Sequence, residues 1–295
     1  MMLGASQSDA ARLRLGARTM DGGDTTQRRS GLEWRPSLGH RPTERLAPTE
    51  VATGLSFNGR PHTVLMATPA DLEDLALGFT VTEGVAGLAD ITGITVEQKP
   101  EGFLADVQLA PGAALRRARP RTLEGRSSCG LCGVQRLADA IRPLPVVATG
   151  QRFAPEAIQA ALEQLSDRQA LGRLTRATHA AGFASADGTV GLVREDVGRH
   201  NALDKLAGAL LRAGVDPTTG FVVVTSRCSF EMVEKTARMG CPMIVAVSAP
   251  TDLAIRKAEE AGITLVALAR ADGHTVFSGE ARLQGDHRAS ALTHV

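Results

Sequence analysis

Tyrosine is absent from this 295-residue sequence, and the chain holds only one tryptophan and eight phenylalanines. Proteins that bind single-stranded nucleic acid stack its bases on aromatic side chains, so this scarcity argues against such a platform. The net charge of +1 gives no overall attraction to polyanions. We therefore expect no nucleic acid among the partners, and any basic site has to be local.

Long apolar runs are missing as well. No run approaches the roughly 20 residues that a membrane span needs. The first residues, MMLGASQSDAARLRLG, contain no apolar core of a secretory signal. Four cysteines in a chain of this length do not make a disulfide framework. These features predict a cytoplasmic protein in a reducing compartment, with no membrane partner.

Lysine is rare, and most of the 33 basic residues are arginines. A GC-rich genome would give the same excess, but the placement of the arginines is more informative. Residues 113–128, AALRRARPRTLEGRSS, hold five arginines against one glutamate and show no helix or strand period. We expect residues 113–132 to be a mobile basic loop that ends in the pair Cys129 and Cys132.

The first half of the chain divides into two parts. Residues 1–47 are rich in Arg, Gly and Ser and predict a disordered tail. Residues 48–112 predict a small α+β domain with a hairpin that turns at Asn58-Gly59 and an amphipathic helix ended by Gly84. Two further strands are expected at 91–99 and 102–110.

The second half, residues 133–280, predicts an α/β domain, followed by a C-terminal tail over 281–295. Continuous β-branched runs alternate with amphipathic helices in its last third, which is typical of β-α-β crossovers and a parallel sheet. The overall fold class is therefore α/β (α+β when the small domain is included). Strands are expected at 221–225, 243–248 and 263–269 and in a pair over 178–196; helices are expected at 133–141, 154–166, 199–214, 230–240 and 251–262.

Parallel strands place their carboxyl ends on one edge of a sheet, where open α/β proteins bind small ligands. The segments at that edge would be TSRCS (225–229), SAPT (248–251) and RADG (270–273). The first two lead into helix N-termini, whose free N–H groups suit phosphate. We expect a binding rim for a phosphorylated molecule; three ordinary capping loops would give the same pattern.

The pair Cys129 and Cys132 admits several chemistries. A structural zinc ion needs four ligands, and Cys228 and Cys241 lie at unsuitable spacing, so no structural metal is expected. A thioredoxin-like pair would follow a core strand, whereas this pair follows an irregular loop. Nearby arginines and a helix start favour the thiolate, which makes a mobile sulfur nucleophile the better interpretation. Cys228 could line the rim, and Cys241 is expected to be a small core residue.

Three motifs occur in order along the chain: SSCGLCG (127–133), REDVGRHNALDK (194–205) and SRCSFEM (226–232). They resemble the FdhD family of sulfur carrier proteins, which support the maturation of formate dehydrogenase. The likeness runs from about residue 34 to about residue 277 and includes NGRPHTVLMATPADLEDLALGF (58–79). The segment before residue 34 lies outside it.

The resemblance implies a cytoplasmic, homodimeric sulfurtransferase. Such proteins accept sulfur from a cysteine desulfurase as a persulfide, which maps onto Cys129, with Cys132 as an auxiliary thiol. They deliver it to the molybdenum (or tungsten) cofactor with two pterin guanine dinucleotides, the Mo-bis(molybdopterin guanine dinucleotide) acceptor, before it enters formate dehydrogenase. The larger domain would resemble cytidine deaminases. The family's cofactor-contacting stretch maps onto Leu268, Ala269, Arg270, Ala271, Asp272 and Gly273.

The remaining motif residues have both structural and binding interpretations. Glu195, Asp196, Arg199 and His200 follow a strand and open a helix, where capping and ion pairing are common. Alternatively, Arg199 and His200 bind a pterin or phosphate group, and Ser226 and Arg227 join them. Glu231 and Lys235 are expected to pair along one helix, and His179 has no assignment.

Two other functions stay open. A cofactor-binding chaperone would need the rim but no reactive thiol. A thiol-disulfide oxidoreductase would need a reversible disulfide between Cys129 and Cys132.

Overall fold

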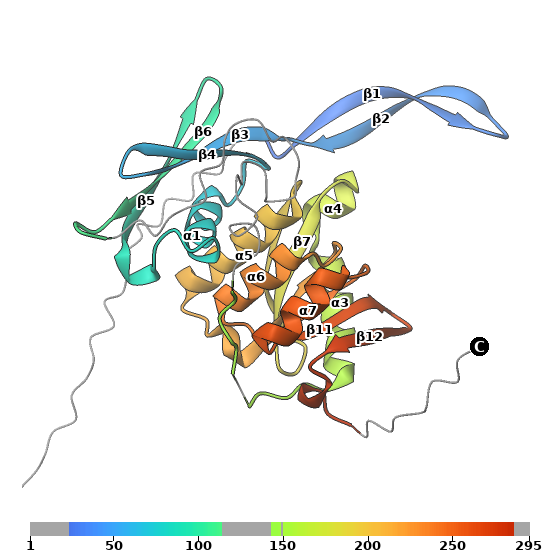
Figure 1. The fold of residues 1–295 in the computed structure, drawn as a ribbon. Helices are drawn as coiled ribbons and strands as arrows, with labels where there is room; N and C mark the ends of the chain where they lie inside the picture. The colour runs from blue at the N-terminus through green and yellow to red at the C-terminus, as the bar shows by residue number, and fades with distance from the viewer. Residues whose placement is uncertain (1–23, 114–142, 149, 286–295) are drawn as a thin grey trace, which may run out of the picture.

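The computed structural model describes residues 24–113, 143–148 and 150–285. Its largest element is a six-stranded sheet with helices on both faces (Figure 1). The strand order is β12-β11-β10-β9-β7-β8. The strands are β7 (His179–Ser185), β8 (Val190–Asp196), β9 (Gly220–Val224), β10 (Met243–Ala246), β11 (Thr264–Arg270) and β12 (Gly273–Ser278).

The predicted parallel strands are confirmed. β10 pairs in parallel with both β9 and β11, because two helical crossovers connect them. The hairpin of β7 and β8, with its predicted turn at residues 187–188, extends the sheet beyond β9 in antiparallel fashion. β12, which the sequence did not predict, returns antiparallel to β11. The carboxyl ends of β9, β10 and β11 therefore share one edge, as expected.

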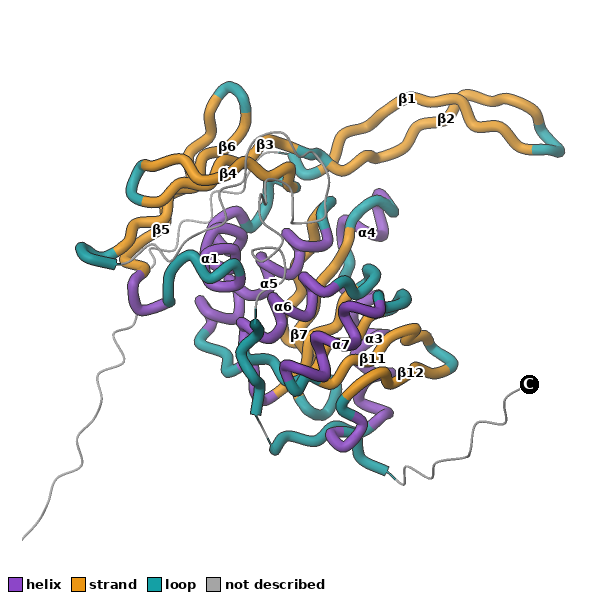
Figure 2. The backbone as a smooth tube through the Cα atoms, in the orientation of Figure 1, coloured by secondary structure: helices purple, strands orange, loops and turns teal. Residues whose placement is uncertain are grey.

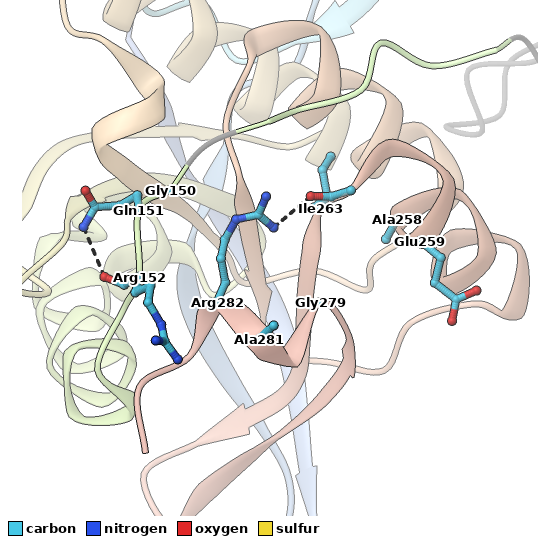
Figure 3. A pocket seen from close by; sticks show the side chains of 10 residues that line it. Gly150, Gln151, Arg152, Ala258, Glu259, Ile263, Gly279, Ala281 and Arg282 are labelled. Atoms are coloured by element: carbon cyan, nitrogen blue, oxygen red, sulfur yellow. Dashed lines mark hydrogen bonds between the residues drawn. The ribbon is translucent and has the colours of Figure 1, made fainter. Parts of the chain in front are cut away.

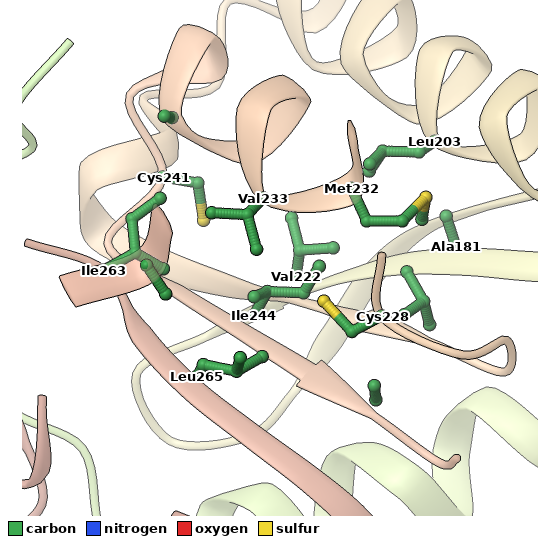
Figure 4. Close-up of a cluster of buried hydrophobic side chains, with 14 of the residues drawn as sticks. Ala181, Leu203, Val222, Cys228, Met232, Val233, Cys241, Ile244, Ile263 and Leu265 are labelled. Atoms are coloured by element: carbon green, nitrogen blue, oxygen red, sulfur yellow. The ribbon is translucent and has the colours of Figure 1, made fainter. Parts of the chain in front are cut away.

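Helices form the outer two of three layers. One face of the sheet packs against α5 (Arg199–Ala213), α6 (Phe230–Met239) and α7 (Asp252–Ala261). The other face packs against α3 (Pro155–Arg168), with the short α4 (Ala170–Thr175) after it. Figure 4 shows the first of these cores, in which Cys228 and Cys241 lie among apolar side chains of strands and helices. The prediction that Cys241 is a small core residue is confirmed.

A second, four-stranded sheet belongs to residues 51–109 and lies beside the helical body (Figure 2). Its strand order is β4-β3-β6-β5, and its hairpin turns at residues 58–59 as predicted. The elements are β3 (Val51–Phe57), β4 (Arg60–Ala67), α1 (Leu72–Thr82), β5 (Ile91–Lys99) and β6 (Gly102–Leu109). Short 3₁₀ turns occupy Leu88–Asp90, Pro217–Thr219 and Glu280–Arg282.

The small sheet joins the larger body through a very close crossing of α1 and α5. A Cβ atom at Gly78 would overlap the carbonyl oxygen of Asp204, and one at Gly208 would overlap that of Asp74. The two helix backbones can approach this closely only because each presents a glycine at the crossing. The middle of α5 is therefore packed directly on α1.

The prediction of a disordered tail over residues 1–47 is wrong for its described part. Residues 26–48 form an antiparallel ribbon of β1 (Thr26–Arg35) and β2 (Gly39–Pro48), which extends away from the body (Figures 1 and 2). The polar composition of this segment gave no strand pattern, because a ribbon that buries few side chains needs no apolar face. Trp34, the one tryptophan, is 60% exposed on it.

Residues 281–285 are likewise part of the folded body rather than a tail. Leu283 is buried in the core beneath α3 and bridges to Phe153. The predicted helix at 133–141 lies outside the described residues. Among the helices that the structure does describe, none is both long and apolar enough to cross a bilayer.

Candidate functional site at the carboxyl edge of the sheet

The carboxyl edge of the large sheet gathers more motif residues than strand polarity alone predicted. β8 is antiparallel to β7, and β7 is antiparallel to β9, so β8 runs parallel to β9. The end of β8 and the start of α5 therefore reach the same edge as residues 225–229 and 248–251. His179, which begins β7 opposite Asp196, reaches it too.

Three basic side chains meet at one end of this edge. Arg199 and His200 form the first turn of α5, and His179 is close enough to feel both charges. Burial, together with the charges of Arg199 and His200, lowers the pKa of His179, and Asp196 offsets this only in part. We name His179, Arg199 and His200 the basic cluster.

Glu231 faces the basic cluster from the first turn of α6. Its Oε2 atom accepts a 2.8 Å hydrogen bond from Ser229 Oγ and lies 3.5 Å from His200 Nε2. Burial alone would raise the pKa of Glu231, but His200, the Ser229 hydroxyl and Arg199 outweigh burial and hold that pKa below its ordinary value. The sequence therefore predicted the wrong partner, since Glu231 does not pair with Lys235.

Lys235 instead serves a buried junction between helices. Its ammonium group lies 2.8 Å from a carboxylate oxygen of Asp204 on α5 and 2.8 Å from one of Glu83, just past α1. Thr82 donates a hydrogen bond of 2.6 Å to the same Asp204. Because Lys235 and its partners come from three different helical segments, sequence spacing could not reveal this junction.

The two acidic residues before α5 have structural tasks, as the capping interpretation expected. Glu195 accepts hydrogen bonds from the backbone N–H groups of Leu171 and Gly172 and so caps α4. Asp196 is fully buried and pairs with Lys205 at 2.6 Å. It also accepts from the backbone N–H groups of Thr68 and Gly198.

Residues 268–273, which the resemblance maps to cofactor contact, lie at the other end of the same edge. Residues 268–270 end β11, residues 271–272 form the turn and Gly273 starts β12. The register with β12 shifts between Ala267 and Arg270, and Leu268 has a φ of 51° with 41% of its surface exposed. A non-glycine residue in the left-handed region is strained, and such strain is often found at ligand sites.

Ser226, Arg227 and Cys228 follow β9, which lies between the strands of the basic cluster and the strand that ends in residues 268–270. Ser226 is buried and donates its hydroxyl proton to the Arg227 carbonyl, whereas the Arg227 side chain is exposed. The backbone of Cys228 is hydrogen-bonded to residues 249 and 251, which ties the loop after β9 to the loop after β10. The side chain of Cys228 points into the core, so it does not line the rim.

Cys129 and Cys132 lie outside the described residues. The two described cysteines are buried, and burial raises the pKa of each thiol to about 12. Neither would form a thiolate near neutral pH. Within the described ranges, no group of three His, Cys, Asp or Glu side chains could hold a metal ion.

A hollow of about 760 Å³ lies at the opposite, amino edge of the sheet (Figure 3). Gly262 and Ile263 line it before β11, and Gly279 lines it after β12. Arg282 also lines this hollow, but its guanidinium donates to the backbone carbonyls of Gly262 and Val147. Because its charged group is engaged in joining segments of the fold, the motif residues at the carboxyl edge are the better candidate site.

The chain is similar to known proteins over most of its length. A model of the FdhD/NarQ family matches residues 48–284. The chain belongs to this family. It is 49% identical over 251 residues to the sulfur carrier protein FdhD of Cupriavidus necator, covering 83% of this chain and 86% of that protein. The sulfur carrier protein FdhD of Bordetella bronchiseptica is 46% identical over 236 residues, which is 79% of this chain and 86% of that one.

The fold of this FdhD/NarQ member is also similar to the fold of a solved crystal structure. It is described as that of a formate dehydrogenase accessory protein from Desulfotalea psychrophila, and it matches with a TM-score of 0.71 and 25% identity. The match covers 88% of this chain and all of the other.

Sequence reasoning left His179 unassigned and took Glu231 as structural. The signal that could have placed His179 was the strand pair before α5. If that pair extends the parallel sheet as an antiparallel hairpin, both its first residue and the residues after its second strand must reach the carboxyl edge.

Proposed function

We propose that this protein is a sulfur carrier, a sulfurtransferase that takes sulfur from a cysteine desulfurase as a persulfide on Cys129. In that step the Cys129 thiolate attacks the terminal sulfur of the desulfurase persulfide. The old S–S bond breaks, the desulfurase cysteine leaves as a thiolate, and a new S–S bond forms on Cys129. Cys132 is an auxiliary thiol in this scheme.

One observation carries the proposal: a chain of the FdhD/NarQ family, similar to proteins named sulfur carriers, holds a glycine-flanked cysteine pair after five arginines. The arginines favour a thiolate there. The buried thiols of Cys228 and Cys241 are poor alternatives, because burial keeps them protonated.

The acceptor in this proposal is the Mo-bis(molybdopterin guanine dinucleotide) cofactor destined for formate dehydrogenase, and the carboxyl edge would hold it. The edge offers Arg199 Nε, a buried polar atom without a hydrogen-bond partner among the described residues, and His200, whose Nε2 atom lies 3.5 Å from Glu231. It also offers the irregular backbone of residues 268–273. These groups fit a large phosphorylated ligand. A cytoplasmic homodimer and a cytidine-deaminase-like large domain complete the proposal.

Mass spectrometry tests the sulfur carrier directly. The purified protein is incubated with a cysteine desulfurase and cysteine, and the peptide that contains residue 129 is examined for one added sulfur. We expect that sulfur in the wild type and in Cys228→Ala, the control that removes a buried thiol. An unmodified wild-type peptide would overturn the proposal.

The same variants separate the alternatives through formate dehydrogenase activation. A cofactor-binding chaperone would keep full activation in Cys129→Ala, whereas a sulfur carrier would lose it. A thiol-disulfide oxidoreductase would form a reversible disulfide between Cys129 and Cys132 and would gain no sulfur from the desulfurase.

A further inference from the structure

The ribbon of β1 and β2 buries little of its own surface. Most of its side chains are exposed on both faces, and a two-stranded ribbon by itself is only marginally stable in water. β2 contacts α4, and the ribbon extends from there away from the body (Figure 2). A further surface that covers one face of the ribbon would therefore stabilise it.

One face of the ribbon is apolar near its turn. Leu32 on β1 lies opposite Pro42 on β2, and Trp34 lies on the same face because side chains alternate along a strand. Leu38 is in the turn between the two strands. Leu32, Trp34 and Leu38 are 65%, 60% and 50% exposed, and we name them the ribbon patch. A gathering of large exposed apolar side chains typically marks an interaction surface.

The small sheet of the same chain carries a second apolar patch. Val64 and Met66 alternate on β4 with Leu65, which packs on the core between the sheet and α1. They therefore lie on the outer face, where they are 50% and 51% exposed. Their neighbours on β3 are Gly54 and Ala52, which are too small to cover them. We name Val64 and Met66 the sheet patch.

We propose that two copies of this chain exchange their ribbons, so that the ribbon patch of each copy packs on the sheet patch of the other. Each contact then occurs twice about a two-fold axis and gives a closed dimer. The strands have ten residues each and extend roughly 33 Å, which is long enough to reach a second body. The proposal names an interface for the homodimer of the proposed function and depends on no other part of that function.

The size of the ribbon favours an exchange over the packing of ribbon on ribbon. With strands about 4.8 Å apart, one face of the ribbon covers roughly 300 Å². Two ribbons packed face to face would bury roughly 600 Å², which is less than the roughly 1,000 Å² of a specific interface. Two ribbons that each cover an equal area of the partner's body bury roughly 1,200 Å², which reaches the range of stable dimers.

The distribution of charge favours the same arrangement. Residues 26–48 hold five arginines and two glutamates, whereas residues 51–109 hold eight acidic residues and two basic ones. Two ribbons therefore repel each other, and each ribbon is attracted to the part of the partner copy that contains the small sheet. Exchange brings these opposite charges together.

Analytical ultracentrifugation of the full-length protein measures the oligomeric state. We expect the wild type to be a dimer at micromolar concentration and Trp34→Gln to weaken the dimer at least about tenfold, because buried aromatic anchors dominate interfaces. Val146→Gln is the matched control, since Val146 is 71% exposed and belongs to neither patch. A monomeric wild type, or a Trp34→Gln variant that dimerises as well as the wild type, overturns the proposal.

A second variant guards against a folding defect in the ribbon. Met66→Gln leaves the ribbon intact and should weaken the dimer as Trp34→Gln does, while circular dichroism checks that both variants are folded. A folded Met66→Gln protein with an undiminished dimer shows that the sheet patch is not the acceptor, and this result also overturns the proposal.

Cross-linking between two copies locates the contact. In the variant with alanine at positions 129 and 132, the two thiols that remain are buried. In this background, a copy with Leu32→Cys is mixed with a differently tagged copy that carries Val64→Cys, and a short bismaleimide should join them. Val146→Cys in place of Val64→Cys should give no product. No product with Val64→Cys, or as much product with Val146→Cys, contradicts the exchange.

The same proteins separate other occupants of the ribbon patch and the proposed function. A monomeric wild type that sediments with phosphatidylglycerol vesicles, and loses this in Trp34→Gln, would assign the patch to a lipid surface and overturn the proposal. Trp34→Gln should still receive sulfur on Cys129 from the desulfurase. A wild type that dimerises through its ribbons but takes up no sulfur would support the exchange and overturn the sulfur transfer alone.

Discussion

The buried pair of Lys205 and Asp196 provides the sharpest test of how the carboxyl edge is built. Both side chains are fully buried, their charged atoms are 2.6 Å apart, and Lys205 also donates to the carbonyl of Thr68. In Lys205→Met the apolar stem remains and the charge is lost. Asp196 keeps three donors, from the backbone of Thr68 and Gly198 and from the side chain of Asn201.

Removing one partner of a buried pair costs about 3–5 kcal/mol, because the other charge stays buried without compensation. The donors that Asp196 keeps place the expected loss at the lower end, about 3 kcal/mol. Lys257→Met is the matched control, since Lys257 pairs with the exposed Glu260 and such a pair contributes about 1 kcal/mol or less. Urea unfolding followed by circular dichroism gives the free energy of unfolding of each variant.

Equal free energies of unfolding for the two variants would refute the reasoning. If Lys205→Met is too unstable to purify, the double variant Asp196→Asn/Lys205→Met removes the unpaired charge and should recover part of the stability. A double variant no more stable than the single one would show that the charge of Asp196 is not what makes Lys205 necessary.

Three further outcomes follow from contacts in the structure. Gly208→Ala should lower the free energy of unfolding by about 1–3 kcal/mol because its Cβ would push α5 from α1, whereas Gly191→Ala, with open space around it, should not. The folded state lowers the pKa of His179, so the unfolded chain binds more protons than the folded protein below about pH 6.5. The free energy of unfolding should therefore fall as the pH drops from 7 to 5. Urea unfolding of His179→Asn should show a weaker dependence on pH. In Cys129→Ala/Cys132→Ala, native thiol titration should find no fast-reacting group, because Cys228 and Cys241 are buried; rapid labelling would contradict this.

The sequence predicted most of the large sheet because its strands are buried on both faces. Residues 221–224 and 243–246 are entirely buried, so their β-branched runs are continuous and need no alternating pattern to be read. The crossover helices end at Gly240 and Gly262, both at positive φ, which marked their boundaries. Strand polarity then placed residues 225–229 and 270–273 on one edge without any structural information.

The ribbon of β1 and β2 could not be predicted in the same way. Its side chains are mostly exposed on both faces, so burial imposes no period on its sequence. Glu33 pairs with Arg35 and Arg45 on one side, and Leu32 and Trp34 alternate on the other. That short alternation was the available signal, and the surrounding Arg and Gly residues obscured it.

The sequence singled out Arg199 and His200 of the candidate site but not His179, Glu231 or the arrangement, and the reason is the assignment of charges. A sequence shows Glu195, Asp196, Arg199 and His200 as neighbours, which suggests that their charges cancel. The fold instead joins Glu195 to the start of α4, more than 20 residues earlier, and Asp196 to Lys205 at the end of the same motif. The acidic half of the motif is therefore engaged in folding, and His200 of the basic half contacts Glu231 of α6 instead. We therefore expect substitutions of Asp196 chiefly to reduce stability, and substitutions of Arg199 chiefly to affect the proposed binding of the cofactor.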